Sequence, residues 1–80
     1  MFGSRNSVEI QIPYYKGEGT YEDTVLGRKI IKAFGRPHGH GVGFGYEDFS
    51  YYDIKPTRLK AFIKRARSIV KGKGRVNIFK

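Results

Sequence analysis

The sequence predicts a small α+β domain in which two helices lie on one face of a four-stranded antiparallel sheet. The chain has 80 residues, which leaves room for one hydrophobic core and no second domain. Two segments repeat apolar residues with a helical period, and the segments around them have the pattern of strands. The resulting order, β-α-β-β-α-β, predicts a ferredoxin-like split βαβ arrangement with right-handed crossovers. The whole chain, 1–80, is therefore expected to form one domain, with 1–6 as a flexible N-terminus.

The first strand is expected from Ser7 to Tyr14, because apolar and polar side chains alternate there. The apolar members are Val8, Ile10 and Ile12, and their alternation predicts one buried face. Pro13 has no backbone N–H group, which indicates an edge position or an exit from the sheet.

The first helix is expected to begin at Thr20, as the N-cap, and to end at Phe34. Asp23 follows Thr20 by three residues, as in an Asp variant of the capping box. The apolar face comprises Leu26, Ile30, Ala33 and Phe34. Gly35 is expected to end the helix, and Pro37 cannot continue it.

A β-hairpin and a second helix follow. The hairpin is expected to have its turn near Tyr46 to Asp48, between a strand at 42–46 and a strand at 49–54. Pro56 opens the second helix, and Gly72 is expected to cap it. Its apolar face is Leu59, Phe62, Ile63, Ala66 and Val70, at i, i+3, i+4, i+7 and i+11. A final short strand, 75–79, should point Val76 and Ile78 inward.

The surplus positive charge is confined to the last third of the chain. The sequence has 16 basic and 7 acidic residues and a formal net charge of +9. Residues 1–54 contain six basic residues and all seven acidic ones, whereas residues 55–80 contain ten basic residues and no acidic one. Because like charges repel one another, a block of one sign indicates an anionic partner. The alternative interpretation is a face that only keeps the protein in solution.

The second helix and the loop after it hold the candidate contacts with phosphates. Four cations at i, i+4, i+7 and i+11, namely Lys60, Lys64, Arg67 and Lys71, should form one solvent-facing row. Such a row can pair with phosphates and release counterions. The full candidate set is Arg58, Lys60, Lys64, Arg65, Arg67, Lys71, Lys73 and Arg75. The same residues could instead be ordinary helix-surface side chains that cover the edge of the core.

An aromatic segment suggests base stacking as a second kind of contact. The residues Gly43, Phe44, Gly45, Tyr46 and Phe49 match the aromatic strand motif of RNA-recognition-motif domains. The resemblance to that family covers only the eight residues 42–49. Val42 and Glu47 depart from the motif, the companion motif in the first strand is absent, and 35–41 is too short for the family's additional strand. The physical idea stands separately, because exposed aromatic residues on an open sheet face can stack on bases. The candidates on that face are Tyr52 and Phe79.

His38 and His40 form a His-x-His pair in a glycine-rich segment. Such a pair can contribute to metal binding or to acid–base chemistry, but two histidines leave a zinc site short of ligands. A flexible turn is the simpler interpretation. The chain has no cysteine, so neither a disulfide nor a cysteine-bound zinc is expected. The sequence contains no complete catalytic or metal motif, and it predicts no cofactor.

These observations favour a non-enzymatic domain of the cytoplasm that binds nucleic acid, DNA or RNA, through its second helix and the adjoining loop. One alternative is a small interaction or inhibitor protein, of phage type for example, that docks on an acidic or nucleic-acid-binding surface of a larger protein. A second alternative is a small basic ribonuclease that uses His38 or His40 beside Arg36 and a tyrosine. The apolar runs are too short to span a membrane. Because the second helix needs its apolar face for the core of the domain, no membrane partner is expected.

Overall fold

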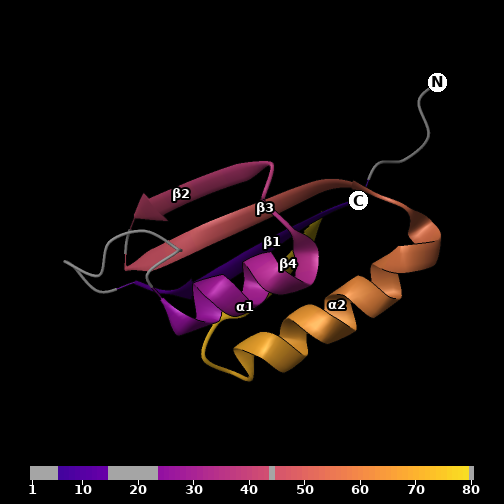
Figure 1. The fold of residues 1–80 in the computed structure, drawn as a ribbon. Helices are drawn as coiled ribbons and strands as arrows, with labels where there is room; N and C mark the ends of the chain where they lie inside the picture. Colours follow the sequence, from indigo (N-terminus) through magenta and orange to yellow (C-terminus); the bar gives the residue numbers. More distant parts are fainter. Residues whose placement is uncertain (1–5, 15–23, 44, 80) are drawn as a thin grey trace.

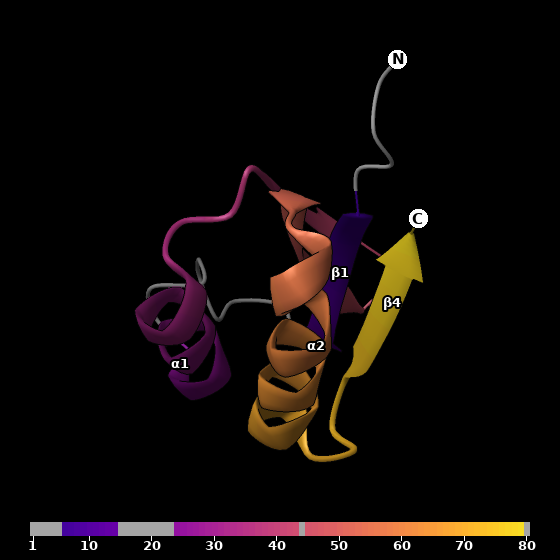
Figure 2. The same cartoon turned by 90° about the vertical axis from the view of Figure 1, so that its right-hand side faces the viewer.

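The computed structural model of the chain describes residues 6–14, 24–43 and 45–79. The elements in chain order are β1 (Asn6–Pro13), α1 (Val25–Phe34), β2 (Gly39–Gly43), β3 (Tyr46–Ile54), α2 (Pro56–Val70) and β4 (Arg75–Phe79). The strands form one antiparallel sheet in the order β2-β3-β1-β4, and both helices cover the same face of it (Figures 1 and 2). The prediction of a small α+β domain with two helices and a four-stranded antiparallel sheet is thus confirmed. None of the described helices is long and apolar enough to cross a membrane.

The core lies between the sheet and the two helices. Its buried apolar members are Val8, Ile10, Ile12, Ile30, Phe49, Tyr51, Ala66 and Val70. Alternate residues of β1 point into it, as predicted. The two helices meet through Phe34 and Phe62, whose rings stack with their centroids 4.0 Å apart. On α2 the predicted apolar face is confirmed, with Leu59, Phe62 and Ile63 partly buried against the core.

The opposite face of the sheet carries no helix (Figure 2). The strand register places there Ser7, Glu9 and Gln11 of β1, Asp48 and Ser50 of β3, and Arg75, Asn77 and Phe79 of β4. The edge strand β2 adds Gly39, Gly41 and Gly43 to this face. We call this surface the open face. Because these three residues are glycines, β2 contributes no side chain to the open face.

The first strand differs from its prediction at both ends. It begins at Asn6, within the segment expected to be flexible, and the buried Asn6 amide donates to the Ile54 carbonyl at 3.3 Å. Residues 1–5 lie outside the described residues. Although β1 is an inner strand, β4 pairs with it only from Ser7 to Gln11. At Pro13 the strand therefore has a neighbour on one side only, and there proline is tolerated.

The first helix begins later than predicted. Its N-cap is Thr24, whose Oγ1 accepts a hydrogen bond from the Gly27 N–H at 3.1 Å. The expected cap, Thr20, and its partner Asp23 lie outside the described residues. The two threonines are four residues apart, about one helical turn, so the apolar periodicity predicts both starts equally well. The predicted end at Phe34, with Gly35 as the cap, is confirmed.

The turn of the hairpin lies two residues earlier than predicted. Gly43 pairs with Tyr46, so two residues connect β2 to β3, and Gly45 has a positive φ of 81°. Glycine adopts that conformation without the steric cost that other residues incur. The shift moves Glu47 and Asp48 from the expected turn into β3.

Within the described part of the chain, two non-glycine residues have left-handed backbones, and both mark an irregularity. Asp53, with φ 56°, lies where the register changes from Val8–Tyr51 to Asn6–Ile54, so β3 contains a bulge. Lys71, with φ 43°, is the C-cap of α2, and its N–H donates to the Arg67 carbonyl at 2.9 Å. The helix therefore ends at Val70, and its cap lies one residue before the predicted cap, Gly72.

Candidate nucleic-acid interface

The outer surface of α2 is positively charged along its whole length. All nine basic residues from Lys55 to Arg75 are exposed, and this stretch contains no acidic residue. Phe62 and Ile69 mark the side of α2 that meets α1, through the Phe34 stack and a shared hollow. Successive residues of a helix are rotated by about 100° around its axis. This rotation places Lys60, Lys64 and Arg67 on the flank of α2 that is turned away from α1.

Lys71 leaves this row because its left-handed backbone ends the helix. Together with Lys73, and with Lys29 of α1, it lines a hollow of about 280 Å³ between the two helices. The apolar part of this hollow is formed by Leu26, Ile69 and Val70, and Ser68 adds a hydroxyl. Lys29 was not among the predicted contacts, because only the packing of α1 against α2 brings it near the end of the second helix.

The structure divides the predicted cations among three surfaces. Lys60, Lys64 and Arg67 lie on the flank of α2 away from α1, and Lys71 and Lys73 continue from them past the end of the helix, beside the hollow between the helices. We call these five residues the basic ridge. Arg58 and Arg65 lie on the flank of α2 toward α1. Arg75 belongs to the open face, where its guanidinium carbon lies 5.5 Å from the centroid of the Tyr46 ring.

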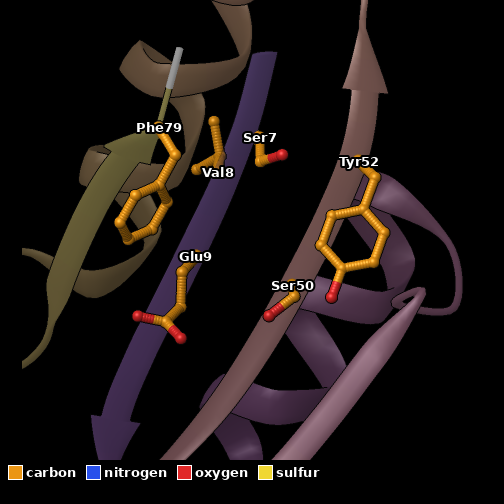
Figure 3. Close-up of a pocket in the computed structure, with 6 residues that line it drawn as sticks. All are labelled: Ser7, Val8, Glu9, Ser50, Tyr52 and Phe79. Atoms are coloured by element: carbon orange, nitrogen blue, oxygen red, sulfur yellow. The ribbon is translucent and has the colours of Figure 1, made fainter. Parts of the chain in front are cut away.

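The two predicted stacking residues lie together at one end of the open face. Tyr52 is 48% exposed and Phe79 is 55% exposed. They line a hollow of about 310 Å³ with Ser7, Val8, Glu9 and Ser50 (Figure 3). Figure 3 shows one ring on each side of β1. We call this hollow the aromatic hollow.

His38 holds Tyr52 in place. Its Nδ1 accepts the Tyr52 backbone N–H at 2.8 Å, and the two rings stack at 5.4 Å with an interplanar angle of 13°. The glycine at position 39 leaves room for the Tyr52 side chain, because a Cβ atom there would lie only 3.0 Å from the Tyr52 hydroxyl. His38 thus lies in the connection between α1 and β2, as expected of a turn, and in addition it contacts a candidate stacking residue.

His40 has a different partner. It lies in β2, and its Nε2 is 2.6 Å from Oε2 of Glu47, a carboxylate with no exposed surface. The His40 side chain itself is 27% exposed. The other carboxylate oxygen, Oε1, is buried without a hydrogen-bond partner. The sequence did not indicate this pair, because Glu47 was expected in an exposed turn.

The residues of the ribonuclease alternative are only partly brought together. His38 contacts two tyrosines, Tyr52 and, edge to face, Tyr51. Arg36 is exposed in the connection between α1 and β2. His40 instead pairs with Glu47. Among the described residues, no three histidine, aspartate or glutamate side chains are grouped so that they could hold a metal ion.

The segment that resembles the RNA-recognition motif does not form one strand here. Its first two residues end β2, and its last four begin β3. Phe49 is fully buried in the core, so it cannot stack on a base. Tyr46 faces the open side beside Arg75, and Phe44 lies outside the described residues.

Comparisons with models of known protein families, with curated proteins and with solved structures found no match. The assignment of a function therefore depends on the chain's own residues.

Proposed function

We propose that this domain binds nucleic acid, with the basic ridge against the phosphates and the rings of Tyr52 and Phe79 against the bases. The observation that carries the proposal is a charged surface of one sign. The described cations from Lys55 to Arg75 are all exposed, and no acidic residue lies among them in the sequence. Ordinary helix surfaces mix both signs of charge, so this one suits a polyanion.

The length of the ridge also supports the proposal. Lys60 and Lys71 are eleven positions apart, which corresponds to about 16 Å at a rise of 1.5 Å per residue. One strand of a nucleic acid places a phosphate about every 3.4 Å along the helix axis. The ridge can therefore follow about five phosphates.

The topology offers a supporting surface for the bases. The order of elements together with the strand order β2-β3-β1-β4 supports a ferredoxin-like split βαβ arrangement. In that arrangement the helices occupy one face and leave the other accessible. The exposed rings of Tyr52 and Phe79 then have the position needed for stacking on unpaired bases.

The proposal is tested by the salt dependence of binding to labelled DNA and RNA. Five phosphate contacts should give a log–log slope of about −3.5 on a single strand and about −4.5 on a duplex. The double variant Lys64→Gln/Arg67→Gln should bind all sequences more weakly and should lower the slope by about 1.5 to 2. Thermal unfolding should change little, because both side chains are exposed.

The matched control is Lys32→Gln/Arg36→Gln, which removes the same two charge types from exposed positions in and after α1. This variant should retain most of the affinity and the slope. Equal losses in both variants would mean that net charge, and not the ridge, attracts the nucleic acid. If the wild-type protein binds neither DNA nor RNA at low salt, the proposal is wrong.

A second candidate function is docking on an acidic protein segment, and the hollow between the helices favours it. Lys29, Lys71 and Lys73 surround an apolar floor that includes Leu26 and Ile69. A peptide that alternates leucine or phenylalanine with acidic residues would complement both features. Binding of such a peptide, lost in Ile69→Ser with retained folding, combined with no nucleic-acid binding, would establish this function in place of the first.

A further inference from the structure

We infer that the aromatic hollow is a guanine-selective site, in which the base stacks on Tyr52 or Phe79 and the Glu9 carboxylate reads its Watson–Crick edge. This inference rests on the proposed function and adds a base preference to it. Phosphate contacts position a nucleic acid without reading its sequence, so any preference must come from a site that touches base edges.

The two exposed rings offer a base a surface to stack on. Tyr52 and Phe79 lie on β3 and β4, the two neighbours of β1, and adjacent strands are about 4.8 Å apart. The two backbones are therefore about 9.5 Å apart. Figure 3 shows both rings lying over the open face, one on each side of β1, so a base can stack on the exposed face of one ring while its edge lies over β1, the strand of Glu9. His38 already stacks on Tyr52, which reduces the entropy that Tyr52 loses when a base binds.

The polar group at the hollow is a carboxylate that a neighbouring amide contacts. Glu9 lines the hollow beside Ser7 and Ser50 (Figure 3). Its Oε1 accepts a hydrogen bond from the Asn77 amide at 3.3 Å, and Asn77 is its register partner on β4. An ionised carboxylate can only accept hydrogen bonds and has about four sites for them. Capacity for further donors therefore remains on Glu9.

The charge of Glu9 determines what the hollow can take. A phosphate would be repelled by the carboxylate, and the basic ridge lies on α2, on the helix-covered side of the sheet (Figure 2). A base edge with hydrogen-bond donors would be attracted. The hollow therefore suits a base and not a phosphate.

Guanine has the best-matched edge. Its N1–H and N2–H groups lie side by side, so they can donate to the two oxygens of one carboxylate in a charge-assisted, bidentate pair. Adenine and cytosine present one amino donor beside an unprotonated ring nitrogen, which a carboxylate repels. Uracil and thymine present one N–H between two carbonyl oxygens. The Ser7 or Ser50 hydroxyl can donate to the guanine O6 atom.

The experiment measures the affinity of the full chain for labelled single-stranded RNA hexamers at several salt concentrations. Hexauridine is compared with hexamers in which one central uridine is replaced by guanosine, inosine, adenosine or cytidine. The guanosine hexamer should bind about tenfold more tightly than hexauridine, because a bidentate base contact discriminates by about five- to a hundredfold. Inosine, which lacks the N2 amino group, should lie between them.

The Glu9→Gln variant should remove the preference for guanosine, because an amide offers one acceptor and one donor in place of two acceptors. Its affinity for hexauridine should be unchanged or higher, since a negative charge is lost. The control is Asp48→Asn, which removes the same charge from another position on the open face. This control should retain the ratio between guanosine and uridine.

The outcomes separate this inference from the proposed function. Salt-dependent binding without a preference for guanosine, or with a preference that survives Glu9→Gln, would overturn the inference and leave the proposed function intact. Absence of binding to every RNA hexamer at low salt would overturn the inference, and absence of binding to DNA as well would also overturn the proposed function. A guanosine preference that Glu9→Gln abolishes and Asp48→Asn retains would establish the site.

Discussion

Glu47 has no exposed surface, and one of its oxygens bonds to His40 while the other has no hydrogen-bond partner. A buried acceptor without a partner costs about 1–3 kcal/mol. The bond to His40 offsets part of the larger cost of burying the carboxylate. The two side chains therefore stabilise the domain only as a pair, and removal of one changes the energy of the other.

We expect His40→Ala to lower the free energy of unfolding by about 2–3 kcal/mol. This loss is below the 3–5 kcal/mol typical of a broken, fully buried pair, because 27% of the His40 side chain is exposed. Glu47→Met should cost less than about 1 kcal/mol, since it removes the buried charge and keeps the volume. Denaturant unfolding measures both. If His40→Ala leaves the free energy of unfolding unchanged, the pair does not contribute to stability.

The same pair shows why single residues were hard to place from the sequence. Acidic residues between two strands usually indicate a turn, and Glu47-Asp48 was placed there on that basis. The competing signal was the two-residue turn ending at Gly45, which moves Glu47 into a strand and onto the core side. Alternation in the first strand had no competing signal, and its inward residues were predicted correctly.

Among the elements, α2 was predicted most accurately, and its one error lies at its C-terminus. The periodicity of apolar residues defines its packed face but carries no information about the last turn. Gly72 was expected to cap the helix, yet Lys71 takes the left-handed conformation. That conformation costs a non-glycine residue about 1–2 kcal/mol. The helix therefore ends at a strained lysine that also belongs to the basic ridge.

This combination predicts opposite effects on stability and binding. Lys71→Gly should raise the free energy of unfolding by up to about 1 kcal/mol, because glycine adopts the left-handed conformation without the Cβ clash. The same change should weaken binding to nucleic acid and lower the salt slope by about one. Thermal unfolding and a salt titration test the two effects.

Lys71→Gln is the matched control, because it removes the charge but keeps a Cβ atom. It should weaken binding as much as Lys71→Gly does, without the gain in stability. If Lys71→Gly is less stable than the wild-type protein, the left-handed backbone is not a source of strain.

At the scale of the whole molecule, the block of positive charge was visible in the sequence, but its division among surfaces was not. The flank that each cation occupies depends on the position of α1 beside α2 (Figure 2). Arg58 and Arg65 lie toward α1, and Arg75 lies on the open face. The spacing of cations along the sequence of one helix could not assign these residues to different surfaces. The position of Tyr52 and Phe79 followed more directly from the alternation of the strands.

The two parts of the proposed interface are on different sides of the sheet, with the edge strand β4 between them. A single strand can bend around that edge and reach both parts. A duplex has a persistence length of about 150 base pairs and cannot make such a bend without a large cost. At equal salt, a single-stranded oligonucleotide should therefore bind more tightly than a duplex of the same length.

The difference in affinity between a single strand and a duplex should vanish when the rings of Tyr52 and Phe79 are removed. Tyr52→Leu/Phe79→Leu should lower the affinity for single strands, because each stacked base contributes about 1–3 kcal/mol. Its affinity for a duplex should not change. Competition between the two oligonucleotides measures both, and a duplex that binds the wild-type protein more tightly would contradict this arrangement.

The bulge in β3 has a consequence for the length of the chain. Tyr51 pairs with Val8, and Ile54 pairs with Asn6, so Asp53 is surplus to a regular ladder. A chain with this one residue deleted would keep Tyr51 and Ile54 toward the helices and Tyr52 toward the open face. It would lose the extra twist that a bulge adds to a strand, and with it the angle at which Tyr52 meets the aromatic hollow. Such a deletion should therefore leave a folded domain with a reduced preference among bases, so that an in-frame loss of one codon would act on recognition and spare the fold.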